Sequence, residues 1–374
     1  MLKASSQATR RRCVVPTSPV LPLASLFHCH SRIPRRYARI PLLISRLSST
    51  SLSNSKLALS GELTSFPLGR SDFGEIRQLP GTAYFDKTEY IPVLAGGPAV
   101  QLVCRPRRFG KSLTISMLRY FHGFQFRGKY HELFQVCGGI LRAIFAHISN
   151  TKEDLDVDKA VQNRTVAPGK YFILTFNFSR AARSGPSVGP LTREMNRGLS
   201  QFKLDYAALL GNPFTSEISH FDKNDPAGNL TDLVDAVART LGGIHDKGDK
   251  GRALWDVQGI YLVADEYDAY SNEYMDPHDP KTWSETESFY LLKAFWSNVK
   301  AARSLYGIRK TYITGVTPLL LSGLTSGAND LENTSFIPEL STICGLTRSD
   351  VLNALRVICH NKEDIQRHFR ELER

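Results

Sequence analysis

The chain has 374 residues, of which 42% are hydrophobic and 22% are charged, a balance typical of folded globular proteins rather than disordered ones. No uninterrupted apolar run approaches the roughly 20 residues that a membrane-spanning helix needs, so we expect no membrane insertion. The six cysteines are scattered, with no pair at zinc-finger spacing, which predicts a reducing compartment and no structural metal.

The net charge of +11 is concentrated in the first 61 residues. This segment contains ten Lys or Arg and no Asp or Glu, which leaves 37 basic and 36 acidic residues in the rest of the chain. Because the body is almost neutral, the high overall charge does not indicate direct binding of nucleic acid.

Residues 1–61 have the composition of an organelle transit peptide, since they are rich in Ser and Arg and lack acids. We predict a basic leader that directs import into the mitochondrial matrix and is removed between Arg46 and Glu62. The alternative is a disordered start of a cytoplasmic protein. The run from His28 to His30 is not expected to hold a metal ion, because adjacent side chains seldom converge on one ion without further ligands. Four arginines recur at helical spacing in this leader: Arg32, Arg35, Arg36 and Arg39.

From residue 62 onward the pattern is that of a packed domain, which we expect to extend to residue 340. Four short apolar runs rich in β-branched or bulky residues predict strands buried on both faces, at 99–104, 171–178, 260–264 and 311–314. Apolar residues at helical spacing predict helices at 111–121, 230–241 and 289–301, with a short helix or tight turn at 87–97. The polar stretches 151–163 and 222–228 are expected to be loops. Alternating strands and helices predict an α/β fold with a mostly parallel sheet and helices on both faces.

The segment Arg105–Ser112 lies between a predicted strand and a predicted helix, the position of a phosphate-binding loop. In such a loop, Lys111 would reach the β- and γ-phosphates and Ser112 would bind Mg²⁺. The general pattern asks for glycine where this chain has Arg105, and a left-handed conformation there would cost about 1–2 kcal/mol. The residues expected to surround the phosphates are Arg107, Arg108, Phe109, Gly110, Lys111, Ser112 and Leu113.

A second motif ends the apolar run 260–264 with two adjacent carboxylates. Asp265 could hold Mg²⁺, and Glu266 could orient and deprotonate the attacking water. Adjacent residues of a strand point to opposite sides, so the two acids fit two separate roles. The alternative is a solvated acidic loop, Asp-Glu-Tyr-Asp, at the end of an ordinary strand.

Five stretches together resemble a known family: FPLGRSDFGEIR, YFDKT, VCRPRRFGKSLTISMLRYF, YLVADEYDAY and YITGVTPLLLSGLTSG. They resemble the AAA-ATPase-like family of predicted P-loop ATPases, particularly its fungal members, in which Arg105 would be the usual residue. The resemblance implies the sheet order of the additional-strand ATPases, with the strand 311–314 between the strands 99–104 and 260–264. It also implies ATP and Mg²⁺ as cofactors, with Ser112 and Asp265 as the metal-binding residues. The candidate catalytic residues are then Glu266, Lys111, Thr314 and Thr317, the two threonines as sensors.

Two further features have weaker interpretations. Arg105, Arg107 and Arg108 could contact phosphates or dock a partner, form an ordinary solvated loop, or contact nucleic acid. Asp86 and Lys87 are expected to position the lead-in segment, residues 66–86, against the phosphate loop.

Residues 341–374 are expected to form a C-terminal helical segment, with one helix over 349–374. The apolar stripe of that helix continues almost to the last residue without a Gly cap, so we expect it to be exposed, with its partner surface in a missing downstream domain, such as the nuclease-like domain of relatives, or in another chain. Two functions remain open. One is Mg²⁺-dependent ATP hydrolysis that switches a conformation or drives a partner; the other is a hydrolytically inactive nucleotide-binding scaffold that regulates an associated protein such as a nuclease.

Overall fold

The computed structural model describes residues 20–21, 57–59, 66–67, 69–79, 82–135, 155–182, 187–248, 250, 252–274, 286–318, 331–359 and 361–372. The predicted amphipathic helix of the leader and the run from His28 to His30 lie outside these residues. No helix in the described part of the chain is long and apolar enough to cross a membrane.

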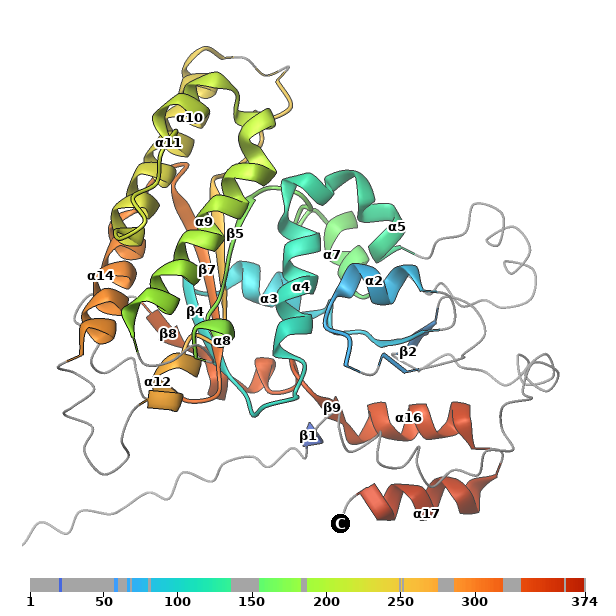
Figure 1. Ribbon diagram of the computed structural model, residues 1–374. Helices are drawn as coiled ribbons and strands as arrows, with labels where there is room; N and C mark the ends of the chain where they lie inside the picture. The colour runs from blue at the N-terminus through green and yellow to red at the C-terminus, as the bar shows by residue number, and fades with distance from the viewer. Residues whose placement is uncertain are drawn as a thin grey trace, which may run out of the picture.

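A five-stranded parallel sheet forms the centre of the fold (Figure 1). Its order is β5-β6-β7-β4-β8, so β7 lies between β4 and β6 as predicted. All four predicted strands are present, and β8 is an addition at the edge beside β4. The strands are β4 (Val100–Cys104), β5 (Phe172–Asn177), β6 (Ile260–Asp265), β7 (Ile308–Gly315) and β8 (Leu331–Asn333).

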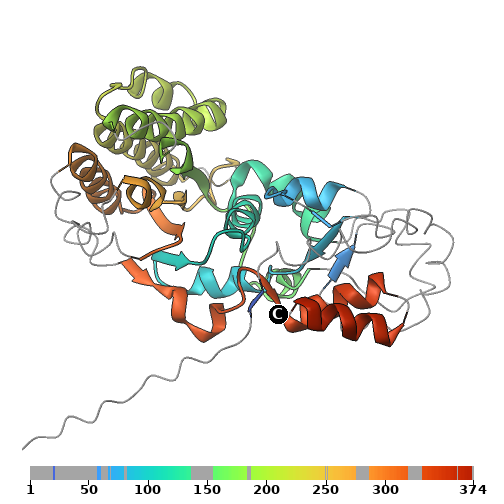
Figure 2. The same cartoon turned by 60° about the horizontal axis from the view of Figure 1, so that its bottom comes forward.

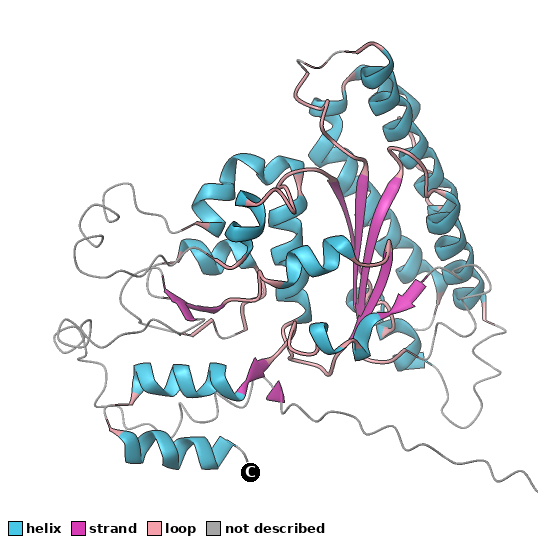
Figure 3. Cartoon of the chain, turned by 180° about the vertical axis from the view of Figure 1, so that it is seen from behind, coloured by secondary structure: helices cyan, strands magenta, loops and turns pink. Residues whose placement is uncertain are grey.

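Helices cover both faces of this sheet, as predicted (Figure 3). The first face carries α9 (Val188–Leu210), α11 (Pro226–Asp246) and α14 (Glu287–Ala301), with α8 (Ser179–Ala182), α10 (Asn212–Glu217) and α12 (Ala269–Tyr274) nearby. The second face carries α4 (Lys111–His122), with α2 (Phe73–Gln78), α3 (Tyr90–Gly96), the 3₁₀ helix η3 (Phe124–Lys129), α5 (Tyr130–Phe134) and α7 (Val157–Gln162). The prediction of a loop over 151–163 is therefore wrong for α7.

Alternation along the strands explains why two separate cores form. In β6, Leu262 and Ala264 pack into the core beneath α9 and α11, whereas Tyr261 and Val263 pack into the core beneath α4. Every residue of β6 is buried. Side chains of successive residues point to opposite faces, so a strand covered on both sides has to be apolar throughout.

A third, smaller core joins the beginning and the end of the described chain. It lies between β3 (Ala83–Phe85), which pairs antiparallel with β2 (Leu57–Leu59), and the helices α16 (Arg348–Ile358) and α17 (Lys362–Leu372). Figure 2 shows these helices, in red, beside the blue strands and far from α9 and α11. The strand β1 (Val20–Leu21) pairs with β9 (Leu346–Thr347), which comes just before α16. The 3₁₀ helices η4 (Thr334–Phe336) and η5 (Pro338–Leu340) precede β9 in the chain.

Two predictions for the C-terminal segment are wrong. It forms two helices that pack against each other rather than one helix over 349–374. Val351 and Leu355 of the predicted exposed stripe are buried, and Phe369 is only 8% exposed. Their apolar surface is covered by Phe66 and Phe85 of the lead-in, so it needs no partner to remove it from water.

Candidate functional site

The phosphate loop connects β4 to α4 at the carboxyl ends of the parallel strands. The backbone N–H of Arg105 donates to the carbonyl of Gly315, which fixes the start of the loop against β7. Arg108 and Gly110 have left-handed conformations, with φ of 66° and 85°. Gly110 is the residue that immediately precedes α4, and glycine adopts this conformation without a steric cost.

Arg105 has no left-handed conformation, so the strain predicted for a side chain at this position does not arise. Its guanidinium instead points to the C-terminal segment. It donates hydrogen bonds to the carbonyls of Ser335 and Leu340, each at 2.9 Å, and of Ser341 at 3.4 Å. A fixed fork of donors is suited to this task, and Arg105 thereby ties the loop to the residues that precede α16.

Lys111 is the first residue of α4 and is only 6% exposed. Its ammonium Nζ donates to the carbonyls of Arg105 and Pro106, each at 3.0 Å. The side chain therefore curls back beneath its own loop, the segment that is predicted to surround phosphates.

Ser112 and Asp265 are in direct contact. The Ser112 hydroxyl donates to Oδ2 of Asp265 at 2.5 Å, although the two residues come from different strand–helix units. Asp265 is 4% exposed, and burial raises the pKa of its carboxyl above the ordinary value. Its other oxygen, Oδ1, is buried without a hydrogen-bond partner among the described residues.

This pair fits Mg²⁺. An orphaned carboxylate oxygen beside a hydroxyl provides oxygen ligands, and Mg²⁺ keeps several waters and takes the rest of its ligands from one or two protein groups and from phosphates. The described residues contain no group of three or more His, Cys, Asp or Glu that could hold a metal by themselves. Ser112 and Asp265 would thus hold the ion only together with a phosphate-bearing ligand.

Glu266 follows Asp265 and turns the chain out of the sheet. It has a left-handed conformation with φ of 50°, which is uncommon for a residue with a side chain. Its pKa is raised by partial burial and then by the charge of Asp265, while Lys111 and Arg107 oppose the shift. A carboxylate with a raised pKa is a better proton acceptor than an ordinary surface glutamate.

The two candidate sensor threonines lie in different surroundings. Thr314 is fully buried in β7, and its Oγ1 has no partner among the described residues. It follows Tyr312 by two positions and so faces α4, on the side of Lys111 and Ser112. The Thr317 hydroxyl is instead in hydrogen bonds of 3.0 Å with Asp268 and Asn272.

Asp268 is a further residue at the carboxyl end of β6, and no role was predicted for it from the sequence. It is 1% exposed, and its Oδ2 accepts hydrogen bonds from the loop that follows β7. A carboxylate three residues after Asp265 was visible in the sequence, but the donors that it binds are about 50 residues away and could not be inferred.

A mostly apolar pocket adjoins the phosphate loop on the side of β3. Its walls come from three parts of the chain. The lead-in and the residue after it contribute Pro67, Ala83–Phe85 and Lys87, and the loop with α4 contributes Phe109, Gly110, Leu113, Thr114 and Met117. The segment before α16 contributes Ile343–Leu346. Three distant parts of the chain thus meet beside the position expected for phosphates.

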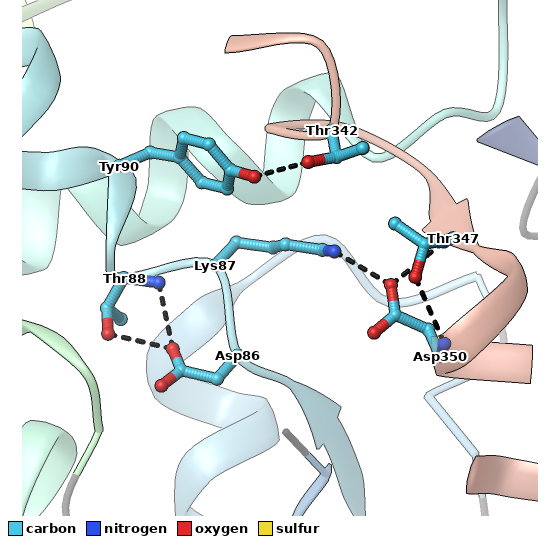
Figure 4. Close-up of polar contacts among 7 residues, drawn as sticks. All are labelled: Asp86, Lys87, Thr88, Tyr90, Thr342, Thr347 and Asp350. Carbon is cyan, nitrogen blue, oxygen red and sulfur yellow. Dashed lines mark hydrogen bonds and ion pairs between the residues drawn. The ribbon is translucent and has the colours of Figure 1, made fainter. Parts of the chain in front are cut away.

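Lys87 and Asp86 fasten the lead-in to its neighbours (Figure 4). Lys87 forms a partly buried ion pair with Asp350 at 2.9 Å, and Asp350 also accepts from the backbone N–H of Thr347 to complete the capping box of α16. Asp86 accepts from Thr88 and from the backbone of Asp156. Burial raises the pKa of Asp86. Their polar contacts are with α16 and with the start of α7, while Lys87 also lines the pocket that adjoins the predicted phosphate loop.

A phosphate loop and an acidic strand end on a parallel sheet of this order define the α/β fold of the P-loop nucleoside triphosphatases. The family described as predicted AAA-ATPase, AAA-ATPase-like, matches residues 67–325, which is more than half of the chain. The chain belongs to this family, and its role is accordingly ATPase-like and nucleotide-binding. No curated protein and no solved structure matches it significantly.

Proposed function

We propose that the protein binds ATP and hydrolyses it with Mg²⁺, and that hydrolysis switches its conformation or drives a partner. The observation that supports the proposal is the contact between Ser112 and Asp265, with Oδ1 of Asp265 left without a partner among the residues that the structure describes. A buried carboxylate with an unpaired oxygen destabilises the fold unless a ligand satisfies it.

Each residue at this edge then has a defined task. Lys111 exchanges its contacts with the loop carbonyls for the β- and γ-phosphates, and the backbone N–H groups at the start of α4 face the same anion. Ser112 and Asp265 hold Mg²⁺, which when bound neutralises charge on the phosphate oxygens.

Glu266 acts as the general base. It accepts a proton from water as the water oxygen bonds to the γ-phosphorus, and the bond from that phosphorus to the bridging oxygen breaks to release ADP and phosphate. Thr314 would contact the γ-phosphate or the attacking water, because its hydroxyl faces the same side of the sheet and has no partner in the described part of the chain.

The decisive measurement is ATP turnover by the full chain, with and without Mg²⁺, for the wild type and Glu266→Gln. We expect the variant to bind ATP like the wild type and to lose about 100-fold or more of the turnover, because an amide cannot accept the proton. Wild-type turnover no faster than that of the variant, measured with Mg²⁺ and saturating ATP, would instead support a scaffold that binds nucleotide without hydrolysis.

We also propose import into the mitochondrial matrix, on the basis of the acid-free, Arg- and Ser-rich composition of residues 1–61. A fluorescent reporter fused to these residues should then enter mitochondria. A diffuse cytosolic signal would refute the proposal.

A further inference from the structure

Asp268 connects the acidic turn after β6 to the loop after β7. Its Oδ2 accepts hydrogen bonds from the backbone N–H of Val316 at 2.8 Å, from that of Thr317 at 2.6 Å, and from the Thr317 hydroxyl at 3.0 Å. Asn272 adds a fourth donor at 2.8 Å. One buried carboxylate oxygen thus fixes the path of the chain just beyond Thr314.

Tyr267 reinforces the same connection. Its backbone N–H donates to the carbonyl of Thr314 at 3.1 Å, and its hydroxyl donates to the carbonyl of Thr317 at 2.7 Å. The two residues after Glu266 are therefore both bound to the segment from Thr314 to Thr317.

Glu266 is held between two fixed points. On one side, Asp265 is part of β6, and its carbonyl accepts from the backbone of Phe178 at 3.1 Å. On the other side are Tyr267 and Asp268. A left-handed conformation of a residue with a side chain is unfavourable and persists only where the surroundings enforce it. The hydrogen bonds of Asp268 supply that enforcement.

Gly315 shows how closely Asp268 approaches β7. A Cβ atom built at Gly315 would lie 2.5 Å from Oδ1 of Asp268 and 2.6 Å from the ring of Tyr267. Real Cβ atoms essentially never come this close to another heavy atom, so a substitution here has to displace the acidic turn. Glycine at this position lets the turn and the strand end meet.

We infer that Asp268 is a positioning residue for the hydrolysis proposed above: it holds Glu266 at the reacting phosphate and Thr314 beside it. The inference rests on the proposed function and adds a residue to it. In this proposal Asp268 acts through Glu266 and Thr314 rather than on the nucleotide or the attacking water. Its loss would let Glu266 relax out of the left-handed conformation, while the phosphate loop, Lys111 and Ser112 would stay in place.

The test compares Asp268→Ala, Asp268→Asn and Gly315→Ala with the wild type, in the full chain. The readouts are kcat for ATP with Mg²⁺ and the Kd for a non-hydrolysable ATP analogue, each per folded molecule. We expect Asp268→Ala to lower kcat about 100-fold, the effect of misplacing a catalytic group by about 1 Å, with Kd changed less than about 3-fold. Asp268→Asn should keep kcat within about 5-fold of the wild type, because its amide oxygen still accepts the backbone N–H groups.

Asp158→Ala is the matched control. Asp158 is also a buried carboxylate, 2% exposed, and it accepts from Tyr130, Gln135 and Gln162. Its loss should lower stability but leave kcat unchanged, which separates positioning from a general effect of removing a buried acid.

Several outcomes would overturn the inference. The inference would be wrong if Asp268→Ala kept the wild-type kcat, or if it lost binding and turnover equally. It would also be wrong if Asp268→Asn were as slow as Asp268→Ala. If Asp268→Ala does not fold, Gly315→Ala decides, because it should show the same loss of kcat at unchanged Kd. A wild type without any turnover would defeat both the proposed function and this inference, whereas an active wild type matched by Asp268→Ala would defeat this inference alone.

Discussion

The Ser112 hydroxyl donates to the Asp265 carboxylate across a sequence separation of 153 residues. These two groups are the proposed Mg²⁺ ligands, and the fold brings them to one edge of the sheet from two different strand ends. Because β7 lies between their two strands, the contact spans the full width of one strand. Both groups are therefore in place before any ligand arrives, which lowers the cost of ordering them on binding.

Lys111→Ala should weaken ATP binding by at least about 30-fold. Truncating one partner of a buried, hydrogen-bonded charge pair costs 2 kcal/mol or more, and the ammonium group of Lys111 is the buried cation of the loop. Binding of a fluorescent ATP analogue measures the effect. Lys223→Ala, which removes an exposed lysine between α10 and α11, should bind like the wild type. Full affinity in Lys111→Ala would contradict the placement of the phosphates.

Asp265→Asn should raise the free energy of unfolding of the nucleotide-free protein at pH 7. Burial raises the pKa of the Asp265 carboxyl, so at neutral pH the folded state carries a charge that it disfavours. A group whose pKa is raised by folding contributes its stability below the ordinary pKa and loses it as the pH rises through the folded value.

The advantage of Asp265→Asn should therefore shrink as the pH falls toward 3.8, where the carboxyl becomes protonated and resembles the amide. Urea unfolding over this pH range provides the measurement. The same variant should lose the Mg²⁺ dependence of nucleotide binding. A variant less stable than the wild type at pH 7 would be inconsistent with a carboxylate kept for a ligand.

Lys87→Ala should destabilise the fold by about 3 kcal/mol, because it leaves the Asp350 carboxylate buried without its cation. The Lys87 side chain is 13% exposed and that of Asp350 is 4% exposed. Adding Asp350→Asn to Lys87→Ala should restore part of the loss, since no unpaired charge then remains. Denaturant unfolding gives the values, and a change below about 0.5 kcal/mol in Lys87→Ala, the range of ordinary surface substitutions, would argue against this attachment of α16.

His122→Phe should flatten the pH dependence of stability below neutrality. Burial lowers the pKa of His122 to about 3, and both ring nitrogens lack partners among the described residues. A depressed pKa gives stability that is present above the unfolded value of 6.5 and is lost as the pH falls. The wild type should lose up to about 1.4 kcal/mol per pH unit through this one residue.

The phenylalanine variant lacks that proton-binding group, and its ring suits the neighbouring Tyr171 and Tyr261. Unfolding at pH 7 and pH 5 should show a smaller difference for the variant than for the wild type. Equal differences in the two proteins would show that His122 is not buried as a neutral ring.

The parallel sheet could be predicted from local signals, whereas its strand order was implied only by the family resemblance. Consecutive apolar residues indicate strands covered on both faces, and the run at Ile260 ends in the carboxylates that place it beside the phosphate loop. The roles of Lys111, Ser112 and Glu266 remain predictions. The geometry adds that Ser112 meets Asp265, which the sequence alone could only imply through family resemblance.

Other features depended on contacts between distant residues. The covered stripe of α16 could not be foreseen, because Phe66 and Phe85 cover it from nearly 300 positions away. The positioning role of Asp268 likewise could be inferred only from its hydrogen bonds with Val316 and Thr317. In contrast, helix α9 could have been predicted from the sequence but was not. Its buried residues recur every three or four positions in the sequence: Leu191, Met195, Leu199, Phe202, Tyr206 and Leu210.

Arg105 affects both how motif searches detect this chain and how its segments can be exchanged in chimaeric proteins. A motif search that requires glycine at this position would pass over the protein, although its loop lies in the usual place between strand and helix. The arginine also makes the loop dependent on Ser335, Leu340 and Ser341, whose carbonyls it binds. A chimaera that exchanged residues 335–341 for unrelated sequence would disturb nucleotide binding from outside the motif, so the loop and this distant segment have to be transferred together.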